Sequence, residues 1–210
     1  MADKLDAAGA RDMLVAVSQS MIDQTDVLTD ADLAIGDGDH GIGMRRGFGS
    51  ALEALRAGEP ESVDAVFKST GMAILSNTGG AAGAVFGTLF RSGAKGFAVG
   101  VVDGESFSAF LEEGLAAVLK RGGVTEGQKT MVDALAPAAR AARAASGDGL
   151  QAATAAAASA ALDGVEATKG MIATTGKARS LGERSIGHPD PGAISISLIL
   201  KAMQDFTAKA

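Results

Sequence analysis

ALAPAARAARAASGDGLQAATAAAASAA, residues 134–161, consists almost entirely of alanine and a few polar residues. Such low complexity is compatible with a disordered segment or with a pair of packed helices. Alanine has the highest intrinsic helix propensity, and its small side chain lets neighbouring helices approach closely. We therefore expect two packed helices here, extending over residues 127–146 and 149–173, with a bend or kink at Pro137.

The rest of the chain has the same helical character. About a fifth of the 210 residues are alanine, and runs of β-branched and aromatic residues, which strands favour, are scarce. The 29 glycines mostly separate apolar-periodic segments. Short connections between long helices favour antiparallel neighbours. The sequence predicts one all-α domain over residues 1–210, an eight-helix antiparallel bundle or barrel with helices at 5–27, 43–57, 61–76, 81–96, 105–121, 127–146, 149–173 and 191–208.

Helical spacing also predicts part of the core. In the helices predicted over 5–27 and 43–57, apolar side chains recur at positions that share one face of each helix. The GxxxG pair Gly83 and Gly87 indicates close helix packing in a chain of this composition. The residues expected to face the core are Leu14, Val17, Met21, Phe48, Leu52 and Leu55, with Val15 and Ile22 at the margin.

Composition excludes several classes of function. The chain has no cysteine, so it forms no disulfide, thiolate metal site or thiol nucleophile. A net charge of −6 and only 4% aromatic residues make nucleic acid a poor partner. With two histidines, a metal site would depend on carboxylates, which suit Mg²⁺ or Ca²⁺. No signal peptide or membrane span is recognisable, so we expect a cytoplasmic protein.

The densest chemical signal is DADLAIGDGDHGIG, residues 30–43. Its four carboxylates repel one another unless a cation or water screens them, and its glycines favour a loop over 29–41. Asp32, Asp37 and Asp39 then predict a site for a hard divalent ion such as Mg²⁺. The alternatives are that Asp39 caps the next helix while the other acids are solvated, or that Ca²⁺ stabilises a structural loop.

Two familiar motifs do not explain this run of acids. It contains GxGxxG, at Gly36, Gly38 and Gly41, but no strand precedes it, and carboxylates inside the loop would repel a pyrophosphate that lacks a metal. An EF-hand is also a poor match, because the glutamate at the twelfth loop position is missing.

A second signal is SNTGGAAG, residues 76–83, at the start of a predicted helix. A glycine-rich turn at a helix N-terminus presents backbone N–H groups and a favourable dipole to a phosphate. The alternative is an ordinary turn between helices, which binds no ligand.

A third signal is GERSIGHPDPG, residues 182–192. Asp190 as N-cap and Pro191 at the first position would start the last helix, which is a purely structural role. Arg184 and His188 lie in the same stiff segment, which would hold a cationic side chain near a ligand at low entropic cost.

Lys129, Thr130 and Met131 are expected to begin the helix over 127–146. A methionine at such a position usually belongs to the core. Its polarizable thioether also suits a flat base.

Taken together and in this order, GDGDHG (36–41), GGAAG (79–83), GQKTMVD (127–133) and GERSIGHPDPGA (182–193) resemble the DhaL family, the nucleotide-binding L subunits of dihydroxyacetone kinase. The similarity extends from about residue 5 to the C-terminus. It implies an eight-helix antiparallel barrel with a nucleotide, ADP or ATP, bound at one end.

The resemblance also implies roles for individual residues. Two Mg²⁺ ions would be held by Asp32, Asp37 and Asp39, and Arg184 would help to neutralise the phosphoryl group in transfer. The nucleotide would be contacted by His40, Gly41, Gly43, Gly80, Ala81, Ala82, Thr130, Met131, Arg184, Asp190, Pro191 and Gly192. His40 as the carrier of a phosphoryl group is the less favoured alternative.

The implied reaction is phosphoryl transfer to a small ketose, dihydroxyacetone or a related triose or tetrose, held on a partner K subunit. A phosphotransferase M subunit would recharge a retained ADP in one form of the family, whereas ATP is the exchangeable donor in the other. Assembly into a homodimer is an alternative that the sequence does not decide. Membranes and nucleic acids are not expected partners.

Two positions depart from the family pattern. The family usually has Asn where this chain has Gly43, and Ser where it has Ala82, so two hydrogen-bonding side chains near the expected phosphates are missing. A different class of function also stays open. The same fold would serve as a non-catalytic helical module that binds a regulator or an apolar ligand.

Overall fold

Helices make up most of residues 3–209, the part of the chain that a computed structural model describes. This part contains nine α-helices, three 3₁₀ helices and no strand beyond an isolated bridge between Leu5 and Val102. The α-helices are α1 (Ala7–Asp23), α2 (Thr25–Ile35), α3 (His40–Ala57), α4 (Val63–Asn77), α5 (Gly80–Gly93), α6 (Gly104–Gly122), α7 (Val132–Ala145), α8 (Leu150–Thr168) and α9 (Pro191–Thr207). The 3₁₀ helices are η1 (Ala94–Phe97), η2 (Ser146–Asp148) and η3 (Lys177–Ser185). The predicted all-α class is confirmed.

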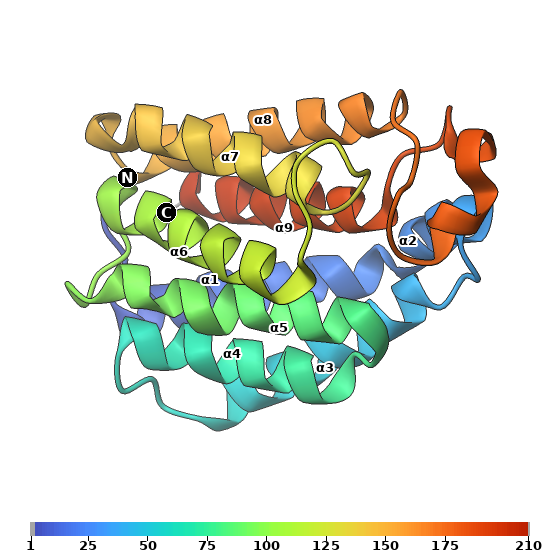
Figure 1. Cartoon of the computed structure of the whole chain (residues 1–210). Coiled ribbons are helices and arrows are strands. Elements are labelled where there is room, and N and C mark those ends of the chain that lie inside the picture. The colour runs from blue at the N-terminus through green and yellow to red at the C-terminus, as the bar shows by residue number, and fades with distance from the viewer. Residues whose placement is uncertain (1–2, 210) are drawn as a thin grey trace.

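Eight of these helices close into a ring. α1 packs against α3, each helix from α3 to α9 packs against the next, and α9 returns to α1. Figure 1 shows them side by side as a barrel, with both chain ends at one end of it and α2 near the other. α2 contacts α3, α9 and η3 rather than taking a place in the ring. The expected eight-helix antiparallel barrel is therefore present, with one additional short helix.

The additional helix arises because the helix predicted over 5–27 is two helices. The chain turns at Gln24, and the Thr25 hydroxyl donates to the Ile22 carbonyl at 2.6 Å. Such a side-chain bond offers the backbone an alternative to a continuous helix. α2 then continues to Ile35, so the loop expected over 29–41 is only residues 36–39, and Asp32 lies on a helix rather than in that loop.

The start of α7 also differs from the expected one. Residues 127–131 form a turn before the helix instead of its first turn. The Asp133 carboxylate accepts the N–H groups of Gly127 and Thr130, the latter at 2.7 Å, and so holds these residues outside the helical conformation. Lys129 adopts a left-handed φ of 59°. From Val132 the helix continues through Pro137.

The alanine-rich region forms two packed helices, as predicted. Ala138 and Ala142 of α7, and Ala153 and Ala157 of α8, are completely buried. The backbones approach so closely that a Cβ added at Gly164 would lie 2.3 Å from the Asp133 carbonyl oxygen. Small side chains are thus what allows α7 and α8 to come together.

Glycines play the same part between α4 and α5. A Cβ added at Gly87 would lie 2.7 Å from the Leu75 Cβ, so the GxxxG pair does mark close helix packing. The core positions predicted from spacing are buried, with Val15 and Ile22 packed against the core at its margin. Those fully or almost fully buried are Leu14, Val17, Met21, Phe48, Leu52 and Leu55.

The antiparallel order determines where a site can form. Alternate connections of an up-and-down barrel lie at the same end. The connections 36–39, 78–79, 123–131 and 169–190 therefore gather at the end opposite the chain termini (Figure 1). We refer to residues 169–190, which include η3, as the strap. Within residues 3–209, none of the helices has the length and apolarity needed to cross a membrane.

Candidate functional site

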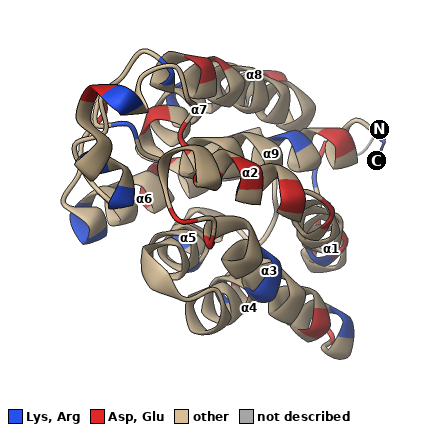
Figure 2. Cartoon of the chain, turned by 90° about the vertical axis from the view of Figure 1, so that its right-hand side faces the viewer, with Lys and Arg blue, Asp and Glu red and all other residues tan. Residues whose placement is uncertain are grey.

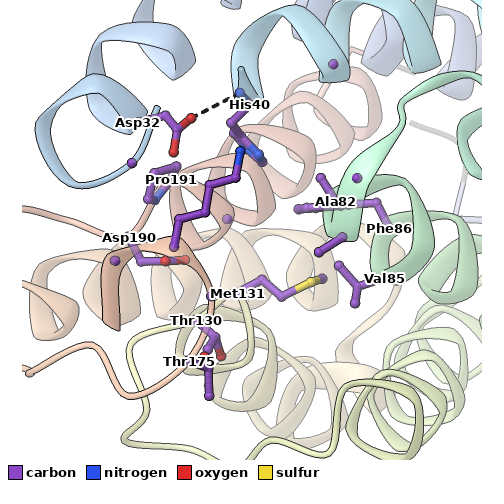
Figure 3. A pocket seen from close by; sticks show the side chains of 18 of the residues that line it. Asp32, His40, Ala82, Val85, Phe86, Thr130, Met131, Thr175, Asp190 and Pro191 are labelled. Atoms are coloured by element: carbon purple, nitrogen blue, oxygen red, sulfur yellow. Dashed lines mark hydrogen bonds between the residues drawn. The ribbon is translucent and has the colours of Figure 1, made fainter. Parts of the chain in front are cut away.

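A pocket of about 510 Å³ opens at the end of the barrel where these four connections meet. Figure 2 looks onto this end, with α2 lying across it. In Figure 3, Asp32 and His40 lie at one end of the pocket and Thr130 and Thr175 at the other, with Met131 between them. A cavity of this size accommodates a small organic ligand of nucleotide dimensions.

Three carboxylates converge at the mouth of the pocket. One oxygen from each of Asp32, Asp37 and Asp39 lies within 4.8 Å of the other two. Asp32 is half-buried because its carboxylate accepts the backbone N–H of His40 at 3.1 Å, at the first residue of α3. Asp39 occupies the N-cap position of α3, as one alternative expected, but its side chain makes no capping hydrogen bond. Asp37 and Asp39 are exposed to solvent.

A lysine from the strap completes this acidic cluster. The Lys177 ammonium donates to the carboxylates of both Asp37 and Asp39, the latter at 3.0 Å. This contact lowers the pKa of Asp37 and raises the pKa of Lys177. A cation thus already lies between two of the three carboxylates. The donor set, three hard carboxylate oxygens around a position that takes a positive charge, fits Mg²⁺.

His40 lines the pocket and is half-buried. Burial lowers its pKa, although Asp32 and Asp39 oppose the shift. Its Nε2 lies 2.8 Å from the Ser195 hydroxyl, which itself donates to the Pro191 carbonyl at 3.1 Å. This contact fixes the orientation of the His40 ring at the start of α9.

The glycine turn presents the N-terminus of a helix to the pocket. Gly79 and Gly80 have φ angles of 81° and 57°, in the left-handed region that glycine tolerates, and α5 begins at Gly80. No side chain caps this helix, so its first N–H groups are available to a ligand. Gly80, Ala81 and Ala82 all line the pocket. The turn and the helix dipole together favour an anion here.

Apolar side chains form the wall opposite the carboxylates. Met131 keeps only 6% of its surface exposed. The other apolar residues of this wall are Val85, Phe86, Val118 and Val124. A thioether among aliphatic groups gives a surface suited to a flat, weakly polar ring.

The last helix begins at the pocket as the sequence predicts. Pro191 is its first residue, and the Asp190 carboxylate accepts the Ala193 N–H at 2.8 Å. Asp190 is half-buried and borders the pocket. This burial, together with the charge of Asp133, raises the pKa of Asp190 to about 7.

The raised pKa of Asp190 predicts a pH dependence of stability. The native carboxyl keeps its proton up to about pH 7, whereas the unfolded chain loses it near pH 3.8. The native state therefore binds more protons in this window, and the free energy of unfolding falls as pH rises through it. The Asp190→Asn variant, which keeps a good N-cap, should show a slope that is less steep by up to about 1.4 kcal/mol per pH unit. Urea unfolding from pH 4.5 to pH 7 measures the slope, and identical slopes for both proteins would contradict the assignment.

Most residues predicted for the site lie around this one pocket. The predicted positions that line it are Asp32, Asp39, His40, Gly43, Gly80, Ala81, Ala82, Thr130, Met131, Asp190, Pro191 and Gly192. Asp37 belongs to the acidic cluster at its mouth. Gly41 instead faces α2, where an added Cβ would lie 2.2 Å from the Thr29 hydroxyl. Arg184 is exposed on η3 and is not part of the lining.

Two cations of the pocket were missed by sequence reasoning. Lys177 has no motif around it beyond a neighbouring glycine, and only the folded strap brings it to the acids. Arg46 lines the pocket and donates to the Thr78 carbonyl at 3.0 Å, at the end of α4. Arg46 follows the predicted site residue Gly43 by one helical turn and therefore lies on the same face of α3, which is the signal that could have identified it.

Comparison with known proteins identifies relatives that are similar over most of this chain and most of their own length. The family model described as the DAK2 domain matches residues 34–205. The ADP-binding subunit DhaL of PEP-dependent dihydroxyacetone kinase 1 from Listeria innocua serovar 6a is 40% identical over 179 residues, which are 84% of this chain and 85% of the relative. The corresponding subunit from Escherichia coli (strain K12) is 38% identical over 183 residues, 86% of this chain and 87% of that protein.

A solved structure has the same fold. The dihydroxyacetone kinase from C. freundii, in complex with AMP-PNP and Mg²⁺, matches 93% of this chain with a TM-score of 0.74 and 26% sequence identity. The match covers 33% of that longer chain, so this protein corresponds to about a third of it.

Proposed function

Because the chain belongs to the DAK2-domain family, we propose that it is the nucleotide-binding subunit of a dihydroxyacetone kinase-type enzyme. In this proposal it binds ADP or ATP together with Mg²⁺ and takes part in phosphoryl transfer to a small ketose. The observation that carries the proposal is the arrangement at one end of the barrel. Carboxylates, an uncapped helix N-terminus and an apolar wall surround one pocket, in the places that cation, phosphates and base require.

The acidic cluster is the proposed metal site. Asp32, Asp37 and Asp39 would hold Mg²⁺, and two ions are part of the proposal. When bound, Mg²⁺ neutralises charge on phosphate oxygens and orients them. The protein prepares this site by fixing Asp32 through its bond to the His40 N–H, so that one of the three ligands is in place beforehand.

The remaining pocket residues position the nucleotide. The N–H groups at the start of α5 would bind phosphate oxygens, and Met131 would lie against the base. Phosphoryl transfer needs little covalent chemistry from the protein, so orientation and charge neutralisation supply most of the catalysis. Arg184 is exposed at the rim, so a role for it in neutralising the transferred group would require the strap to move or the acceptor to approach from outside.

The two departures from the family pattern act on phosphate binding. Gly43 and Ala82 both line the pocket, so the missing Asn and Ser side chains would have faced the ligand. A Cβ added at Gly43 would lie 3.0 Å from the Thr78 carbonyl oxygen, which leaves little room for a larger residue there. The backbone N–H groups at the start of α5, which no side chain caps, would still donate to a phosphate.

The acceptor chemistry belongs to other proteins in this proposal. The relatives are named as subunits, and a partner K subunit would hold the ketose, a triose or a tetrose. An M subunit that recharges a retained ADP, a homodimer and a cytoplasmic location are further parts of the proposal.

A thermal-shift experiment tests the proposed function. A ligand that binds only the native state raises the free energy of unfolding, by about 2.7 kcal/mol when the ligand concentration is 100 times its Kd. This stabilisation raises Tm. For a chain of this size we expect Tm to rise by roughly 5–10 °C with ADP or ATP plus Mg²⁺, and much less with either alone. No shift with any nucleotide would favour the non-catalytic module. An equal shift with Ca²⁺ alone would favour a structural ion loop.

A further inference from the structure

We infer that Lys129 is a positioning residue, which ties the strap to the barrel and thereby holds the pocket rim in place. This inference rests on the proposed function, since the rim faces the site proposed for nucleotide and Mg²⁺. Lys129 differs from the other lysines of the molecule that the structure describes, because only 2% of its surface is exposed. A lysine is almost never fully buried without partners that satisfy its charge.

The ammonium of Lys129 uses all three of its donors on backbone carbonyls. They belong to Thr168 at 2.5 Å, Met171 at 3.2 Å and His188 at 2.6 Å. Thr168 is the last residue of α8, while Met171 and His188 lie near the two ends of the strap. One cation therefore joins both ends of the strap to each other, at the negative end of the α8 dipole.

Charge balance at this position supports a fixed cation. Desolvation lowers the pKa of Lys129, while the charge of Asp133 opposes the shift, as does Asp190 once its carboxyl ionises above about pH 7. Asp133 holds the turn before α7, and Asp190 begins α9. The Lys129 ammonium thus links the turn with Met131 to the end of α8 and to both ends of the strap.

The backbone at Lys129 is itself strained. Its φ of 59° is the only left-handed value at a non-glycine residue within 3–209. The left-handed conformation is unfavourable for a lysine, and it persists only where the surrounding structure imposes it. The left-handed turn directs the side chain inward, away from the solvent where a lysine normally lies.

The consequence concerns the rim of the pocket. Residues 175–178 of the strap line the pocket, and Lys177 reaches the acidic cluster from there. Besides Lys129, the strap ends are joined by the bond from the Gly187 N–H to the Lys169 carbonyl at 2.8 Å and by the bond from the Asp190 N–H to the Thr168 hydroxyl. Without the ammonium, three carbonyls lose their donor together, and the rim is no longer fixed opposite Asp37 and Asp39.

The test compares Lys129→Met, a neutral side chain of similar length, with Lys169→Met. Lys169 lies at the same end of the strap but is exposed and pairs only with Glu166. Amide hydrogen exchange of residues 169–190 is measured in protein free of metal and nucleotide, and calorimetry measures the Kd for ADP or ATP with Mg²⁺ well below Tm. For Lys129→Met we expect faster exchange and an affinity weaker by roughly 10- to 100-fold. This is the loss of affinity typical when a residue that orients the groups of a binding site is removed. Lys169→Met should behave as wild type.

Each outcome bears on a different claim. Unchanged exchange, or faster exchange with unchanged affinity, would overturn the positioning role. A wild-type protein that binds no nucleotide would overturn the proposed function instead, and the exchange data would still report whether Lys129 holds the strap. If Lys129→Met does not fold, Lys129→Ala is assayed with n-propylammonium and with n-propanol. Recovery of affinity with the ammonium alone supports the role, and equal effects of both overturn it.

Discussion

Replacing Asp37 with asparagine is expected to abolish Mg²⁺-dependent nucleotide binding while leaving the fold unchanged. Asp37 is exposed and contacts no core residue, so its substitution costs little stability. Its carboxylate is one of three that converge within 4.8 Å, and a neutral amide is a far weaker ligand for Mg²⁺. Residues that only orient a metal ligand already contribute about 10- to 100-fold to affinity, so the loss of a ligand should exceed 100-fold.

The matched control is Asp30→Asn. Asp30 belongs to the same run of acids and is exposed on α2, but it is not a member of the cluster. Both variants change the net charge by the same amount, so a general electrostatic effect would weaken binding equally in both. Calorimetric titration of ADP or ATP with Mg²⁺ measures Kd, and circular dichroism checks helicity. Wild-type affinity in Asp37→Asn would refute the metal site.

Replacing Gly164 with alanine should destabilise the barrel by about 3 kcal/mol, the upper part of the range for overpacked cores. The added Cβ would lie 2.3 Å from the Asp133 carbonyl oxygen and 2.7 Å from the Ala134 Cα. Both are backbone atoms, so no side-chain rotation relieves the clash. Asp133 also organises the turn that carries Met131, and the shift of α7 should therefore weaken ligand binding as well.

Gly49→Ala, on another helix, is expected to raise the stability instead of lowering it. Gly49 lies within α3, and a Cβ added there meets no atom within 4 Å. Alanine is favoured over glycine inside a helix, so this variant should be more stable by about 0.5–1 kcal/mol. Denaturant unfolding measures both free energies. With about 2–4 °C per kcal/mol for a chain of this size, Tm should fall by roughly 6–12 °C in Gly164→Ala and rise slightly in Gly49→Ala. A loss of stability in both would contradict the packing argument.

The acidic cluster shows which features of a site the sequence predicts and which need the folded structure. The run from Asp30 to Gly43 predicts a cation site because clustered carboxylates require a counter-charge, a local property that composition and spacing record. Spacing did not reveal that Asp32 lies in the last turn of a separate helix, α2, nor that its carboxylate accepts the N–H of His40. The chain turns at Gln24, where the Thr25 hydroxyl donates to the Ile22 carbonyl, and helix propensity does not register such a side-chain bond.

The sequence by itself determined the all-α fold and the order of the barrel helices, because helix propensity, apolar spacing and glycine turns are local properties of the chain. Most residues around the pocket followed instead from the resemblance of the sequence motifs to the DhaL family. Only the tertiary structure decided which cations meet those residues. Lys177 reaches Asp39 across 138 positions of sequence, and Lys129 reaches the His188 carbonyl across 59. Contacts of this kind arise from closure of the barrel, which brings distant connections to one end. No local sequence pattern predicts such a contact, because the two residues that make it belong to segments far apart in the chain.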